Sequence, residues 1–251
     1  MGCDMLERMR AAPQCDWRYN INDHRRLTVR RTLRCQIMSG GTIQGMIVQP
    51  YIGERYGKEK PFGPSVLVLG ESSYTDTLPV RAPLPSDWNR RIIACVKDRQ
   101  QDPTITRAVG VFYGGFRDFD QRWEFWQTAT FANFVQNNIG RSRKRPTDED
   151  WQGGAACFQE YLDELHPEFV LALGAELWPH LPKSHFRSDC EPVQLQSEDM
   201  PSFVYRHSGG HAFVFGIDHP MAYGWSYAKW TPWVQAALKS AVSFHTTPQR
   251  I

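Results

Sequence analysis

The sequence predicts an α/β domain, a three-layer α/β/α sandwich in which helices cover both faces of a mostly parallel central sheet. Three continuous apolar runs at 66–69, 169–173 and 212–217 indicate strands, because strands of a parallel sheet are buried on both faces and lack polar alternation. The first two runs end at Gly70 and Gly174. Segments with helical spacing of apolar residues separate the runs, and this alternation is typical of three layers.

Helical patterns lie between the strands and after the last one. Apolar residues recur every three or four positions, which predicts helices over 88–96, 123–134, 158–165 and about 227–242. A capping box formed by Thr147 and Asp150 is expected to begin the third helix. Pro232 must lie in the first turn of the last helix or kink it. The second helix would contain Asn133.

The length of the chain and the placement of its charges predict one domain with a basic arm. A chain of 251 residues can bury one substantial core, so we expect a single domain over 42–251. The net charge of +2 is too small to indicate a partner, and the distribution of arginines is more informative. Five arginines between positions 25 and 34 predict a basic arm over 1–41, followed by a peripheral strand at 42–48 and a loop at 50–64.

The cysteines and histidines show no metal-binding pattern. The six cysteines form no Cys-x-x-Cys pair, so neither a zinc site nor an iron–sulfur cluster is expected. His207 and His211 are four residues apart, but no third ligand accompanies them. The chain has no run of 18 apolar residues, and its first residues lack the apolar core of a signal peptide. These features predict a cytoplasmic protein with free thiols, no metal and no membrane contact.

Polar residues follow the first and third strands, where a ligand is expected. Ligands of open α/β sheets bind outside the carboxyl ends of the strands, so segments 70–75 and 219–225 should meet at this edge. Segment 74–113 holds four prolines and is irregular at its ends, which makes it a second source of pocket residues. The sequence therefore predicts one site built largely from these segments.

The order of three short motifs indicates a family. Segment 70–75 reads Gly-Glu-Ser-Ser-Tyr-Thr, Asn133 follows about sixty residues later, and Asp-His-Pro at 218–220 ends the third strand. This order resembles the uracil-DNA glycosylase superfamily. The first motif of that family is Gly-Gln-Asp-Pro-Tyr-His in the founding branch and begins Gly-Glu-Ala-Pro-Gly in the iron–sulfur branch. The Gly, Glu and Tyr of segment 70–75 match one branch or the other, and the resemblance runs from about residue 66 to the last helix.

Three positions depart from the family pattern. Ser72 stands where the founding branch has an aspartate that positions water, and Ser73 replaces the usual proline. Met221 stands where the family has a serine after His-Pro. The cysteines that bind the cluster in the iron–sulfur branch are absent, so the match at Glu71 to that branch does not imply an iron–sulfur cofactor. The resemblance is therefore to a divergent member that works without a cofactor.

The resemblance implies a catalytic role for Glu71, Ser72 and His219. Cleavage of an N-glycosidic bond leaves negative charge on the departing base and positive character on the sugar. His219 would donate a hydrogen bond to the base anion. Glu71 would stabilise the cationic sugar or activate water, and Ser72 would orient that water.

The resemblance also implies a pocket for a flipped-out base, formed by Gly70, Tyr74, Asn133 and Phe116. Asn133 would read the edge of the base, because its amide carries both a donor and an acceptor. Tyr74 or Phe116 would stack on the face of the base. The alternatives within the same segments are Phe112 and Tyr113 for stacking and Asn137 for the edge.

The expected partner is DNA, single- or double-stranded. Arg141, Arg143, Lys144 and Arg145 form a basic run soon after Asn133, and with Ser73 they are candidates to contact the phosphate backbone. We expect the protein to act as a monomer. The base is uracil or a modified pyrimidine, and both DNA repair and defence against phage remain open.

Two other functions fit parts of the sequence. Leu-Gly-Glu-Ser at 69–72 after a strand also looks like the nucleophile turn of serine ester hydrolases of the Gly-Asp-Ser-Leu type, with Ser72 as nucleophile. That family needs a late Asp-x-x-His, whereas Asp218 and His219 are adjacent and would point to opposite faces. The second alternative is a reader of modified nucleic acid that binds without turnover.

Overall fold

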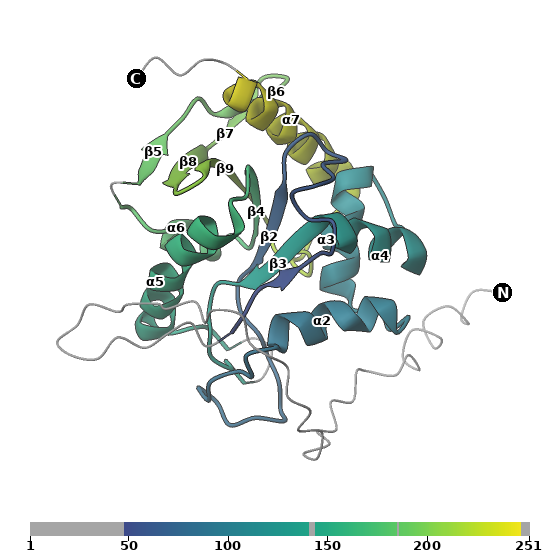
Figure 1. The fold of residues 1–251 in the computed structure, drawn as a ribbon, viewed down its shortest axis with the longest axis vertical. Helices are drawn as coiled ribbons and strands as arrows, with labels where there is room; N and C mark the ends of the chain where they lie inside the picture. The colour runs from purple at the N-terminus through teal and green to yellow at the C-terminus, as the bar shows by residue number, and fades with distance from the viewer. Residues whose placement is uncertain (1–47, 141–143, 185, 247–251) are drawn as a thin grey trace.

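The computed structural model describes residues 48–140, 144–184 and 186–246, which form an α/β fold (Figure 1). Its main sheet has seven strands in the order β1-β3-β2-β4-β9-β8-β5. These strands are β1 (Tyr51–Ile52), β2 (Val66–Gly70), β3 (Ala129–Asn133), β4 (Phe169–Leu173), β5 (Arg187–Asp189), β8 (Ser202–His207) and β9 (Gly210–Ile217). β6 (Val193–Leu195) and β7 (Glu198–Met200) form a separate antiparallel pair.

Helices flank the sheet on both sides. They are α2 (Trp88–Lys97), α3 (Pro103–Tyr113), α4 (Phe119–Thr128), α5 (Asp148–Leu165), α6 (Leu177–His180) and α7 (Tyr227–Thr246). In Figure 1, α2, α3, α4 and α7 lie on one side of the central strands, and α5 and α6 lie on the other. None of the helices in the described ranges is long and apolar enough to cross a membrane.

The sheet is mixed, so the expectation of a mostly parallel sheet is not confirmed. Its four central strands, β3, β2, β4 and β9, are parallel neighbours. The pairs β1–β3, β8–β9 and β5–β8 are antiparallel. The chain turns from β8 into β9 through Ser208 and Gly209 alone, and so short a connection can join only antiparallel strands.

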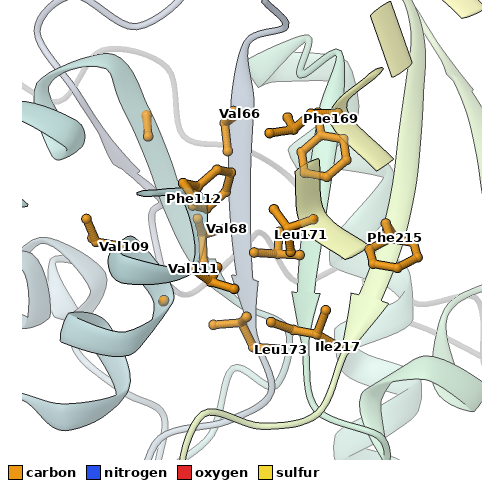
Figure 2. Close-up of a cluster of buried hydrophobic side chains, with 14 of the residues drawn as sticks. Val66, Val68, Val109, Val111, Phe112, Phe169, Leu171, Leu173, Phe215 and Ile217 are labelled. Carbon is orange, nitrogen blue, oxygen red and sulfur yellow. The ribbon is translucent and has the colours of Figure 1, made fainter. Parts of the chain in front are cut away.

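Two hydrophobic clusters fill the spaces above and below the sheet. Successive side chains of a strand point to opposite faces, so Val66 and Val68 of β2 pack with α3, α4 and α7, while Leu67 and Leu69 pack with α5 and α6. Figure 2 shows the first cluster, in which side chains of β2, β4 and β9 meet those of α3. Burial on both faces explains why the central strands are continuous apolar runs.

The predicted helix over 123–134 is wrong in its second half. α4 begins at a capping box between Asp118 and Gln121 and ends at Thr128. Residues 129–133 then form β3, which pairs in parallel with β2 along its whole length. The side chains of Thr130 and Phe131 suit a buried strand, and both are buried in the sheet. Asn133 therefore ends a strand.

Two helix boundaries that the sequence predicted are confirmed. Thr147 and Asp150 form the capping box that begins α5. α7 begins at Tyr227 and contains Pro232 near its start. The predicted arm over 1–41 and nearly all of the predicted strand at 42–48 lie outside the described residues, and the expected loop at 50–64 contains the short strand β1.

Candidate active site

The four parallel strands end at one edge of the sheet. Gly70 pairs in register with Asn133 on one side and with Leu173 on the other. Leu173 in turn pairs with Ile217, beside it in Figure 2. A cavity of about 210 Å³ opens at this edge, which is the volume of roughly seven water molecules in the liquid. The carboxyl ends of the strands therefore frame a pocket where this class of sheet binds ligands.

Most of the residues that the sequence singled out share this cavity. Its lining includes Gly70, Glu71, Ser72, Ser73, Tyr74, Asn133 and His219. The other lining residues were not predicted to belong to the site, and they are Trp88, Ile92, Asp102, Thr104, Ile105, Phe131 and Leu173. Five of these come from segment 74–113, which was expected to supply pocket residues. The structure thus brings the two ends of the predicted site together.

Asn133 is held in place by its neighbours. Its Nδ2 donates a 2.8 Å hydrogen bond to Ser73 Oγ, which also accepts a 2.9 Å bond from Trp88 Nε1. A Cβ on Gly70 would lie 2.3 Å from Asn133 Oδ1, so only glycine leaves room for this amide. Ser73 is almost completely buried. Ser73 is therefore placed to support Asn133. The sequence predicted a contact between Ser73 and a DNA phosphate, but such a contact requires an accessible hydroxyl.

Glu71 lines the cavity in a poorly solvated position. Its side chain is close to Gly174, whose φ of +136° and lack of a Cβ leave space for the carboxylate. Tyr74 Oη donates a long hydrogen bond of 3.5 Å to Glu71 Oε1. Burial, followed by the charge of Glu176, raises the pKa of the Glu71 carboxyl above its ordinary value of 4.5. Raised carboxyl pKa values in clefts are typical of functional sites.

Ser72 contributes a shielded hydroxyl to the pocket. Its oxygen makes no hydrogen bond of good geometry with any described residue. Burial raises the pKa of the Tyr74 hydroxyl, and the nearby Ser72 side chain offsets part of that increase. A shielded polar atom of this kind is stabilised when a ligand or water supplies the missing bond. No hydrogen bond joins Ser72 to His219 within the described ranges, so the structure gives no specific support for a serine nucleophile.

His219 lines the cavity, and one of its ring nitrogens is bonded to the backbone of its own loop. Its Nδ1 accepts a 3.2 Å hydrogen bond from the backbone N–H of Met221, which places the proton of a neutral imidazole on Nε2. Burial lowers the pKa of His219 below 6.5, and the nearby carboxylate of Asp102 offsets part of this effect. At neutral pH the ring is therefore an uncharged donor.

Asp102 is a second carboxylate in the cavity, which sequence reasoning missed. It caps α3, and its Oδ1 accepts hydrogen bonds from the backbone N–H groups of Thr104 and Ile105 at 2.8 and 3.0 Å. Both bonds use the same oxygen, which leaves Oδ2 for another partner. The signal was present as Asp-Pro-Thr at 102–104, because aspartate at the cap followed by proline is typical of a helix start.

Of the residues predicted to stack on a base, Tyr74 lines the cavity, whereas Phe116, Phe112 and Tyr113 do not. Phe116 is exposed and packs against the guanidinium of Arg122. Phe112 is buried among the side chains between the sheet and α3, and Tyr113 contacts Phe62. Phe131, at the end of β3, is the phenylalanine that lines the pocket. Phe116 itself lies between α3 and α4 and does not line the cavity.

The basic run is described only in part. Arg141 and Arg143 lie outside the described residues. Lys144 is exposed, and Arg145 Nη1 forms an ion pair with Glu176 Oε2 at 2.7 Å. Arg145 and Glu176 act on Glu71 with opposite sign, because the arginine lowers the pKa of that carboxyl and the glutamate raises it. The second half of the basic run therefore lies close to the site.

Other candidate positions give no sign of a metal or of a second edge-reading amide. No group of three or more His, Cys, Asp or Glu residues suited to a metal occurs in the part of the chain that the structure describes. The alternative Asn137 donates a 3.2 Å hydrogen bond to Asp150 and does not line the cavity. His207 ends β8, and His211 lies near the start of β9. Both residues line a different cavity, at the other end of β9 from the candidate site.

Comparisons with known proteins give no family for this chain. No protein-family model matches it, and no curated protein matches it.

Proposed function

We propose that the protein is a DNA glycosylase of the uracil-DNA glycosylase type, which hydrolyses the N-glycosidic bond of a flipped-out uracil or modified pyrimidine. The observation that carries the proposal is the shared cavity of Glu71, Asn133 and His219 at the carboxyl ends of parallel strands. We further propose that its layers correspond to the three-layer sandwich of that family, and that it acts as a cytoplasmic monomer. Both DNA repair and defence against phage fit this activity.

The proposed reaction breaks one bond and forms another. The bond between C1′ of the sugar and the ring nitrogen breaks, and its electron pair leaves with the base. His219 Nε2–H donates a hydrogen bond to the oxygen on which the negative charge develops, a role for which the neutral ring is suited. Water then attacks C1′ and gives its proton to a carboxylate. The base anion takes a proton from solvent, and an abasic sugar remains.

Two carboxylates can act on the sugar and the water. Ionised Glu71 stabilises the positive charge at C1′, and burial strengthens this effect because the surrounding dielectric is low. Asp102 Oδ2 accepts the proton of the attacking water, which supplies a base where Ser72 replaces the aspartate of the founding branch. Ser72 orients that water through its shielded hydroxyl.

The loop after His219 and the end of the basic run carry exposed groups that suit a nucleic acid. Tyr223 is completely exposed in the loop after His219, and Met221 is half exposed. The loop is anchored because Arg107 Nη1 donates a 2.6 Å hydrogen bond to the carbonyl of Pro220. Exposed aromatic rings are platforms for unstacked bases, and Lys144 adds positive charge. These features support DNA as the partner.

Release of free base tests the proposal. Purified protein is incubated with single- and double-stranded DNAs containing uracil, deaminated, alkylated or hypermodified bases, and released bases are measured by mass spectrometry. We expect at least one DNA to lose its base and to become sensitive to alkali at that position. Tight, salt-sensitive binding without base release would indicate the non-catalytic reader instead. Hydrolysis of a small ester that Ser72→Ala abolishes would indicate the serine hydrolase.

A further inference from the structure

The large aromatic side chains that are exposed gather on one part of the described surface. Apart from Tyr74, which lines the cavity, they are Tyr113, Phe116 and Tyr223. Tyr113 ends α3, Phe116 lies in the connection to α4, and Tyr223 lies in the loop that joins β9 to α7. The helices α3, α4 and α7 lie on the same side of the central strands (Figure 1). Exposed apolar side chains that gather in this way typically mark a binding surface.

Arg117 and Arg122 hold two of these rings in place. Arg117 Nη2 donates a 2.9 Å hydrogen bond to the carbonyl of Tyr113, and its guanidinium lies 4.9 Å from the centre of the Tyr113 ring. The guanidinium of Arg122, which is fully buried, lies 5.5 Å from the centre of the Phe116 ring. Rings that are fixed before a ligand binds lose little conformational freedom on binding. Tyr113 and Phe116 are therefore preorganised for contact with a ligand.

Arg107 connects these rings to the loop that carries Tyr223. Its Nη1 donates a 2.6 Å hydrogen bond to the carbonyl of Pro220, and its guanidinium lies 5.6 Å from the centre of the Trp225 ring. Burial raises the pKa of the Tyr227 hydroxyl, and the charges of all three arginines offset part of that increase. The three guanidinium groups therefore lie close to one point at the start of α7. We name the whole set the arginine–aromatic surface, and its members are Arg107, Arg117, Arg122, Tyr113, Phe116 and Tyr223.

The arginine–aromatic surface carries a net positive charge. No carboxylate in the described ranges forms an ion pair with its three arginines. The carboxylates nearby have other partners, because Asp118 caps α4, Glu124 pairs with Arg55, and Asp218 pairs with Lys229. Guanidinium groups without a carboxylate partner attract an anion, and a phosphate chain supplies one anion for each of several arginines. The charge therefore favours a nucleic acid as the ligand of this surface.

The same helix connects the arginine–aromatic surface to the cavity. Asp102, Thr104 and Ile105, at the start of α3, line the cavity, and Tyr113 ends this helix. A helix of 11 residues is about 16 Å long. The loop of Tyr223 also follows a lining residue, His219. One DNA strand can therefore occupy the cavity with one nucleotide and the surface with its neighbours.

We propose that the arginine–aromatic surface binds single-stranded DNA, with its arginines on phosphates and its rings stacked on unpaired bases outside the cavity. This inference rests on the proposed function for the choice of DNA, and it goes further by naming the unpaired strand as the preferred substrate. In a duplex, neighbouring base pairs cover the faces of each base. The exposed rings of Phe116 and Tyr223 can therefore stack only on bases that are unpaired.

Binding of DNA without a target base tests this inference apart from catalysis. Fluorescence anisotropy compares a labelled oligothymidylate of about 12 nucleotides with the duplex that it forms with its complement. This DNA contains neither uracil nor a modified base, so the measurement does not depend on base release. We expect the wild-type protein to bind the single strand at least about 10-fold more tightly than the duplex. Equal binding of the two DNAs, or tighter binding of the duplex, would overturn the inference.

Two variants assign the stacking to the exposed rings. Phe116→Ala and Tyr223→Ala should each weaken binding of the single strand by about 5- to 100-fold, because each removes a platform for one base. Ile52→Ala, at an exposed apolar side chain of β1, should bind like the wild type. Urea denaturation confirms that the variants keep the wild-type stability. Unchanged binding in both ring variants would contradict the stacking.

The salt dependence of binding assigns the phosphate contacts. Arg117→Gln should weaken single-strand binding and reduce the slope of log K against log salt concentration by about 0.7. Arg206→Gln, at an exposed arginine of β8, should keep the wild-type slope. An unchanged slope in Arg117→Gln would contradict the phosphate contact. A single-strand preference that the ring variants abolish, without base release from any DNA, would support the inference and reject the glycosylase. Base release without a single-strand preference would do the reverse.

Discussion

The amide nitrogen of Asn133 donates a 2.8 Å hydrogen bond to the hydroxyl of Ser73, and this bond ties the end of β3 to the loop after β2. The same hydroxyl accepts from Trp88 in α2. Ser73 thus joins three elements around the cavity. In the superfamily that the sequence resembles, this position is a proline, which offers no such acceptor.

Ser73→Ala tests whether this hydroxyl positions Asn133. Because two buried donors lose their acceptor, we expect the free energy of unfolding to fall by about 1–3 kcal/mol. We also expect slower base release, because Asn133 loses the bond that holds its amide. Urea denaturation and single-turnover kinetics measure the two effects. A variant with normal kinetics would show that Ser73 only stabilises the fold.

Glu71→Gln should stabilise the protein and inactivate it. Burial raises the pKa of Glu71, so the folded state binds its proton more tightly than the unfolded state does. Stability therefore falls as pH rises from 4.5 through the raised pKa, and the ionised carboxylate is a cost at neutral pH. Removing the charge should raise the free energy of unfolding by about 1 kcal/mol. The exposed Glu198→Gln is the control, and equal behaviour of the two variants would contradict the prediction.

The pH dependence of base release should respond to Arg145 and Glu176. If the ionised form of Glu71 acts, activity rises with pH through the raised pKa of Glu71. Glu176→Gln removes a charge that raises this pKa, so the rise in activity should move to lower pH. Arg145→Gln removes a charge that lowers it, so the rise should move to higher pH. Shifts in the same direction, or none, would show that this ion pair does not act on Glu71.

His219 should be a neutral donor at pH 7. The Met221 N–H bond to Nδ1 and the lowered pKa both favour the tautomer with its proton on Nε2, which nitrogen-detected NMR can identify. Because the folded pKa is lowered, stability should decrease as pH falls from 6.5 through that pKa. His219→Ala should slow base release by about 10²- to 10³-fold. His219→Gln, whose amide N–H can replace Nε2–H, should lose less.

Adjacent glycines in α5 provide a matched test of the packing. A Cβ on Gly154 would lie 2.4 Å from the ring of Phe134 and 2.6 Å from its backbone oxygen, whereas a Cβ on Gly153 would contact nothing within 4 Å. Gly154→Ala should therefore lower the free energy of unfolding by about 1–3 kcal/mol. Gly153→Ala should raise it by up to about 1 kcal/mol. Thermal unfolding of both variants measures the difference, and equal effects would contradict the packing of α5.

The sequence predicted those parts of the fold that depend on local pattern. The apolar runs of β2, β4 and β9 mark strands buried on both faces, and Thr147 with Asp150 marks the start of α5. The sequence could not place β3, because its residues continue the aromatic pattern of α4. Only pairing with β2 decides that 129–133 is a strand. Tertiary contacts of this kind override local periodicity.

The candidate site was predictable where it follows strands and unpredictable where it comes from helices. Gly70 ends a buried strand, and Glu71 and His219 follow buried strands, so the sheet edge itself brings them together. Asp102 and Trp88 reach the cavity from the first residues of α3 and α2, and their positions depend on how these helices pack. Phe116, in the connection between α3 and α4, does not line the cavity, and no local pattern showed where this connection lies.

Base release by matched variants is the most direct test of the central claim. The DNA that loses a base fastest is incubated with wild type, Glu71→Gln and His219→Ala, and free base and abasic sites are quantified together. The account predicts equal amounts of both products from the wild type and at least about a 10²-fold slower reaction in each variant. Absence of free base from every DNA, or full activity in both variants, would contradict it.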